Sequence, residues 1–170
     1  MAVTLDEFIA RARSILETDS GPKGRRRLCN LVQETLRDGT LIASLLPDDG
    51  PERRVLYEDP VLGFAVVAHV HQRAKTSPPH DHGSSWAIYG QAVGQTLMTD
   101  WECVSRPTKD APGKARRVRE YVLLPGDAEL YEPGALHSPR RDGPTRLLRV
   151  EGSNTDRMLR DAYTEAEEAR

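Results

Sequence analysis

Two short segments rich in histidine and glycine decide how this sequence folds. The first reads Ser77-Pro78-Pro79-His80-Asp81-His82 and continues to Gly94, and the second runs from Gly126 through Gly134 to His137. Residues two apart in a β-strand face the same side, so a His-x-His pair can direct two imidazoles to one point. A second such pair, His69-x-His71, precedes the first segment. One pair alone is weak evidence, whereas two linked segments with fixed glycines indicate a β-structure around a metal site.

The region around these segments has the pattern of a β-protein. From about residue 53 the hydrophobic period changes from 3.6 to 2, and Pro-Gly, Asp-Pro and Pro-Pro pairs separate the runs. Short strands separated by turns, without helices between them, predict an antiparallel sandwich or barrel. The expected strands are 54–57, 63–71, 85–93, 95–104, 116–123, 128–131 and 146–150.

Helical patterns precede and follow the predicted barrel. Residues 4–18 carry apolar side chains at helical spacing, and Thr4 with Glu7 forms a capping box. A second amphipathic stretch passes through Leu28 and Leu36 and is closed by Gly39. The charged ending, 154–170, is predicted to be a third helix. The 170 residues therefore predict one domain, with a helical segment at 1–48, a β-barrel at 53–152 and a C-terminal helix.

Composition excludes several classes of protein. The formal net charge of −2 argues against a dedicated nucleic-acid-binding protein. Apolar runs are too short for a membrane helix, and the first residues lack the pattern of a secretory signal. Cys29 and Cys103 are too few for a disulfide framework. We therefore expect a cytoplasmic protein that binds neither nucleic acid nor membrane. The sequence makes no prediction about its oligomeric state.

The two segments resemble the motifs of the cupin superfamily, whose fold is a double-stranded β-helix (jelly-roll) barrel that holds a metal ion. His80, His82 and Gly94 match the first cupin motif, and Gly126, Gly134 and His137 match the second. The resemblance covers about residues 53–152. It implies a mainly β protein with His80, His82 and His137 as metal ligands.

Many cupins add a glutamate as a fourth ligand three or four residues after the second histidine. Trp86 and Ala87 stand at those positions here, and Asp81 faces away from its two neighbours in a strand. Three neutral imidazoles leave the ion its full charge and open positions, which favours an anionic substrate such as a thiolate. Such a site can hold iron(II), zinc, nickel or copper.

The stretch from Leu56 to His82 resembles the thiol dioxygenases more narrowly, such as cysteine dioxygenase and 3-mercaptopropionate dioxygenase. That resemblance implies iron(II) as the metal, and a small thiol carboxylate and dioxygen as substrates, with a sulfinate as product. In cysteine dioxygenase an arginine on an early barrel strand pairs with the substrate carboxylate. Arg53 or Arg54 lies in the matching region, and only one of the two can face inward.

The chain departs from the thiol dioxygenases late in the barrel. Leu147, Arg149 and Glu151 stand where the family has a serine, a histidine and a tyrosine. An inward Arg149–Glu151 pair would present charge to the substrate, and Glu151 could act as a base near the metal. Tyr89 is expected to serve in packing. Trp86 could either line the pocket or serve in packing.

His69 and His71 are expected to face solvent or an interface, because no returning strand supplies a third ligand to them. Two further functions remain open beside thiol oxidation. One is a cupin metalloenzyme that acts on a non-thiol small molecule, and the other is a metal-binding cupin without catalysis. Dependence of turnover on dioxygen separates thiol oxidation from the non-thiol metalloenzyme. The fold alone cannot separate them, since a shared fold does not imply a shared reaction.

Overall fold

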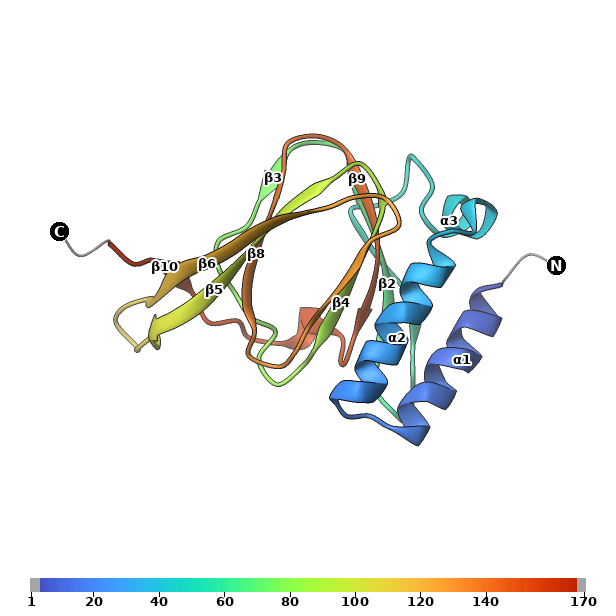
Figure 1. The fold of residues 1–170 in the computed structure, drawn as a ribbon, viewed down its shortest axis with the longest axis horizontal. Coiled ribbons are helices and arrows are strands. Elements are labelled where there is room, and N and C mark those ends of the chain that lie inside the picture. Colours follow the sequence, from blue (N-terminus) through green and yellow to red (C-terminus); the bar gives the residue numbers. More distant parts are fainter. Residues whose placement is uncertain (1–3, 168–170) are drawn as a thin grey trace.

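The computed structural model describes residues 4–167 and consists of a helical N-terminal segment followed by a β-barrel (Figure 1). The helices are α1 (Leu5–Thr18), α2 (Pro22–Thr35) and α3 (Gly39–Leu45). The strands are β1 (Arg53–Glu58), β2 (Ala65–His71), β3 (Lys75–Thr76), β4 (Ala87–Val93), β5 (Thr96–Ser105), β6 (Gly113–Leu123), β7 (Ala128–Tyr131), β8 (Leu136–Arg141), β9 (Thr145–Glu151) and β10 (Tyr163–Glu165).

Two five-stranded sheets face each other and form the barrel. One has the order β1-β2-β9-β4-β7, and the other has the order β10-β6-β5-β8-β3. All neighbouring strands pair antiparallel except β10, which runs parallel to β6. From β2 to β9 the chain crosses from one sheet to the other at every step except β5 to β6, as in a double-stranded β-helix. The predicted mainly β fold is therefore confirmed.

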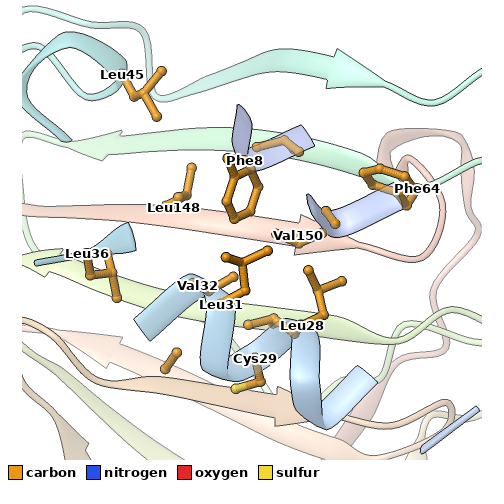
Figure 2. Close-up of a cluster of buried hydrophobic side chains, with 14 of the residues drawn as sticks. Phe8, Leu28, Cys29, Leu31, Val32, Leu36, Leu45, Phe64, Leu148 and Val150 are labelled. Atoms are coloured by element: carbon orange, nitrogen blue, oxygen red, sulfur yellow. The ribbon is translucent and has the colours of Figure 1, made fainter. Parts of the chain in front are cut away.

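The first sheet presents one face to the helices and the other to the barrel interior. Val66, Ile88 and Leu148 are completely buried in the layer between this sheet and the helices. Figure 2 shows Phe8 and Leu28 of the helices beside Leu148 of β9. The intervening residues on the same strands point inward, as the period of two requires. Gly90 lets α2 approach closely, because a Cβ there would lie 2.6 Å from Val32 Cγ1 and 2.8 Å from Leu148 O.

The predicted N-terminal helices are present, with one addition. Thr4 caps α1 and forms the expected capping box with Glu7. Gly39, which was expected to close the second helix, instead begins α3, and the side chain of Asp38 caps α3 by accepting from Leu41 N at 3.0 Å. None of the described helices is long and apolar enough to cross a membrane.

The prediction of a helix over 154–170 is wrong for the described part of that segment. Thr155–Arg157 form a single 3₁₀ turn, and the chain then continues to β10. Tertiary contacts override the local helical propensity. Thr155 N donates to Glu151 Oε2 at 3.0 Å, and the buried Tyr163 ring lies over Gly113. The end of the predicted helix, 168–170, lies outside the described residues.

Candidate metal centre

The backbone joins the two histidine segments directly. His80 N donates to His137 O at 3.0 Å, and His137 N donates to His80 O at 2.9 Å, which forms an isolated antiparallel bridge. The turns beside them are also linked, because Gly134 N donates to Gly83 O at 3.1 Å. Gly83 has φ +58° and Gly134 has φ +76°, a left-handed conformation that glycine adopts without strain. The glycines thus place His80, His82 and His137 at one end of the barrel.

Three buried imidazoles converge at this end. One ligand atom from each of His80, His82 and His137 lies within 4.8 Å of the others. His80 Nδ1 lies 2.9 Å from Pro78 O, and His137 Nδ1 lies 3.0 Å from Ala135 O. A carbonyl oxygen only accepts hydrogen bonds, so both Nδ1 atoms carry the proton and both Nε2 atoms are bare. This is the outer hydrogen-bonding arrangement of metal-ligating histidines.

The spacing of the Nε2 atoms fits a shared cation. His82 Nε2 and His137 Nε2 lie 3.2 Å apart, and both are buried. Two nitrogens bonded at about 2.0–2.1 Å to one ion, with an angle of about 90–110°, would be about 2.8–3.4 Å apart. His82 Nδ1 has no hydrogen-bond partner among the described residues, so no contact there fixes its tautomer. The donor set therefore fits a divalent metal ion.

Burial keeps these imidazoles neutral. Desolvation lowers the pKa of His80 to about 4, although its bond to Pro78 O opposes the shift. Desolvation also lowers the pKa of His82 and of His137 far below the usual value, and Arg149 adds to both shifts. A neutral imidazole is the form that ligates a metal. The Tyr131 ring stacks on His137 with centroids 3.9 Å apart and fixes its plane.

Tyr89 belongs to this centre, contrary to the expectation that it serves in packing alone. Its hydroxyl lies 3.1 Å from both His82 Nε2 and His137 Nε2. Counting in steps of two from His82 placed Tyr89 on the opposite face, but the turn at Gly83 interrupts the strand before β4 begins. Strand parity therefore does not carry across this turn. The Arg149 guanidinium lies over the Tyr89 ring, with its Cζ 4.3 Å from the centroid.

A polar cavity of about 170 Å³ reaches His80 from the barrel interior. Its lining holds five cationic side chains and two carboxylates, namely Arg53, Lys75, Arg141, Arg149 and Arg160 with Glu52 and Asp156. Tyr89 also lines it. The excess of positive charge favours a small anionic occupant.

His69 and His71 also line the cavity, so the expectation that they face solvent or an interface is wrong. They lie on the inward face of β2, with their rings stacked at 5.7 Å. His69 Nε2 lies 3.3 Å from Arg149 Nη1. Because a guanidinium only donates, that nitrogen of His69 is an acceptor and His69 supports Arg149.

The structure separates the two candidate arginines of β1. Arg53 faces the cavity, whereas Arg54 turns toward the helices and donates to Leu45 O at 2.9 Å. Arg53 is already engaged: its Nη2 lies 3.1 Å from Glu151 Oε2 and 3.0 Å from Asn154 Oδ1, and its Nη1 pairs with Asp156. An arginine held by three side chains is poorly suited to take a substrate carboxylate as well.

Glu151 lies at the centre of a buried ion-pair network. Its Oε1 lies 2.9 Å from Arg149 Nη2, and its Oε2 accepts from Thr155 and Arg53. Burial alone would raise the pKa of Glu151, but these partners lower it below the usual value. Glu151 is thus placed as a charged anchor for two guanidiniums, and it does not line the cavity. Trp86 packs on the helix-facing side, next to Gly152.

Comparisons with known proteins find likeness at the level of structure. No family model and no curated protein matches the chain. KdgF from Halomonas sp. is 19% identical with a TM-score of 0.47, covering 66% of this chain and 90% of that one. A cupin superfamily protein from Desulfitobacterium hafniense is 10% identical with a TM-score of 0.46, covering 65% and 96%. The DMSP lyase DddQ from Ruegeria pomeroyi is 16% identical with a TM-score of 0.44, covering 65% and 50%.

The structure gives Asp81 a role in the turn, which leads to a prediction. Its Oδ1 accepts from Gly83 N at 2.9 Å, and it is not part of the three-histidine group. We expect Asp81→Asn to retain nearly all bound metal, because the amide oxygen can accept the same hydrogen bond. Mass spectrometry measures the metal content per chain. His82→Asn is the positive control, because it removes one of the three imidazoles and should lose the metal. Stoichiometric loss of metal from a folded Asp81→Asn protein would make Asp81 a ligand.

Proposed function

We propose that this protein is an iron(II)-dependent dioxygenase that oxidises the sulfur of a small thiol carboxylate to a sulfinate. One observation carries the metal dependence: His82 Nε2 and His137 Nε2 face each other at 3.2 Å in a buried site, and backbone carbonyls hold Nδ1 of His80 and of His137. The cationic cavity beside His80 supports an anionic small molecule as substrate. His80, His82 and His137 would hold the metal.

When bound there, iron(II) would supply coordination of the thiolate and dioxygen and the redox chemistry of sulfur oxidation. The chain's own part is positioning, charge and control of protons. Three neutral imidazoles leave the charge of the ion undiminished, which favours an anionic sulfur. Burial of His82 and His137 excludes water from two sides of the site.

Tyr89 is the group best placed to handle a proton. Its phenolic hydroxyl lies within hydrogen-bond distance of His82 Nε2 and His137 Nε2. The thiol dioxygenases carry their phenol late in the barrel, where this chain has Glu151. Here a phenol reaches the centre from β4 instead, and the Arg149 guanidinium lies over its ring. Tyr89 can therefore donate to an anionic atom bound among the imidazoles.

The proposal predicts thiol-dependent consumption of dioxygen. The iron(II)-loaded protein is expected to take up one dioxygen per sulfinate formed from 3-mercaptopropionate or cysteine. Tyr89→Phe should lower kcat by about 10- to 1000-fold while metal content is unchanged, because it removes a positioned proton donor and leaves the ligands intact. An oxygen electrode, sulfinate analysis and metal analysis check these expectations.

The Glu151 network also favours a second function, a metalloenzyme that acts on a non-thiol anion. Glu151 stands where the thiol dioxygenases have a late-barrel tyrosine, and it forms ion pairs with Arg53 and Arg149. Absence of oxygen uptake with a panel of small thiols, at verified iron loading, would defeat the dioxygenase and leave this second function. Retained metal with no turnover of any small anion would indicate a binding protein without catalysis.

A further inference from the structure

One cation of the cavity, Arg141, has neither a hydrogen-bond nor an ion-pair partner among residues 4–167. Arg141, on β8, is buried at 6% exposure and lines the cavity. Its Nε has no hydrogen-bond partner among the described residues, and no described carboxylate lies within ion-pair distance. The other cations are all engaged: Lys75 with Glu52, Arg53 with Glu151 and Asp156, Arg149 with Glu151, and Arg160 with Thr155 Oγ1.

An unpaired guanidinium is costly in such a place. Burial, together with the charge of Arg149, lowers the pKa of Arg141 to about 10, so the group is still positively charged at neutral pH. Removing a charge from water without supplying a counter-ion destabilises the folded state. A bound anion would supply that counter-ion. The cavity lining around Arg141 therefore points to a ligand.

A second unsatisfied polar atom lies in the same cavity. His71 Nδ1 is buried without a hydrogen-bond partner, 3.7 Å from Glu52 Oε1, which is beyond bonding distance. Lys75 is the cross-strand neighbour of Arg141 in the β3–β8 pair. Arg141, His71 and Lys75 thus line the same cavity as His80 and Tyr89. The volume of this cavity, about 170 Å³, admits a small molecule.

We propose that Arg141 is the anion-recognition residue of this site and that it binds the carboxylate of the substrate while the reacting group points to the three histidines. A planar guanidinium favours a planar, bidentate oxyanion over a point-like one. His71 Nδ1 supplies one further hydrogen bond. The assignment of the sulfur to the metal end rests on the proposed function, whereas the assignment of the anion to Arg141 does not.

The first test compares two thiols that differ only in the carboxylate. Protein loaded with cobalt(II), whose visible spectrum changes when a thiolate binds, is titrated with 3-mercaptopropionate and with 3-mercapto-1-propanol. Arg141→Met should weaken binding of 3-mercaptopropionate about 10- to 100-fold and leave 3-mercapto-1-propanol within about twofold. Arg140→Met is the matched control, because Arg140 is exposed on the opposite face of the same strand and should change neither affinity. Equal effects of Arg141→Met on both thiols would overturn the proposal.

The second test uses propionate, which has no sulfur, and so separates this proposal from the thiol function. Propionate should raise the melting temperature of the wild type and of Arg140→Met by a few degrees and leave Arg141→Met unchanged. Without propionate, Arg141→Met should melt at or above the wild-type temperature, because it loses an uncompensated buried charge. A propionate shift equal in the wild type and Arg141→Met, or a large fall in the stability of Arg141→Met, overturns the anion site. Absence of any thiol effect on cobalt, with the propionate shift intact, defeats the thiol function alone.

Discussion

His137→Ala is expected to abolish stoichiometric metal binding, with an affinity at least about 100-fold below that of the wild type. Loss of one of three imidazoles leaves two ligands, and no carboxylate joins the group among the described residues. His137 is also completely buried, so the substitution leaves a gap beneath the stacked Tyr131 ring. His80→Ala, at the cavity wall, tests the same ligand set with less loss of packing. Metal content and a metal titration of the purified proteins measure both effects.

The matched control is His71→Ala, because His71 is a buried histidine of the same cavity and lies outside the three-histidine group. It should keep metal near the wild-type level. Circular dichroism establishes that each variant is folded. Full metal occupancy in folded His80→Ala or His137→Ala would show that the ion is held elsewhere.

Deletion of residues 1–46, which carry all three helices, is expected to yield insoluble protein. The helices cover a sheet face formed by β2, β4 and β9, on which Val66, Ile88 and Leu148 have no exposed surface. Uncovering such a face creates an apolar patch on strands, a recognised cause of aggregation. The fraction of soluble protein after expression measures the effect.

A single substitution tests the same face in the full chain. Leu28→Asp places a charge at a fully buried position of α2 and should lower the free energy of unfolding by more than about 4 kcal/mol. Leu159→Asp makes the same change at a side chain that is 99% exposed and should alter stability by less than about 0.5 kcal/mol. Urea unfolding compares them. A soluble, metal-loaded deletion protein would show that the helices are dispensable.

Sequence patterns predicted the strands that alternate regularly and failed where a strand breaks the pattern. Strand β8, which carries His137, was not predicted, because Pro139 within a short run argues against a strand. The structure accommodates that proline, which has no N–H to donate, and its carbonyl accepts from Ser77 N at 3.0 Å. The C-terminal segment failed for another reason, since only contacts with Glu151 and Gly113 determine its path.

For the site, the sequence predicted the three histidines, which the structure brings together. It did not predict the cavity beside them. Spacing reveals which residues share a strand face, but not which face turns inward when a turn intervenes. Tyr89 was misplaced for that reason, and His69 and His71 were directed outward although they lie in the cavity. Arg141 gave no signal, because an unpaired charge is recognisable only once its neighbours are known.

Along β2, β4 and β9, residues that stabilise the packed layer alternate with residues that line the interior. Positions 66, 68, 88, 148 and 150 face the helices, whereas 69, 71, 89, 149 and 151 face the interior. Neighbouring residues on these strands thus have different tasks, one in packing against the helices and the next in lining the interior. A library confined to positions 69 and 71 would change the lining of the cavity and leave the packed layer intact, whereas substitutions at 149 or 151 would leave a buried charge without its partner.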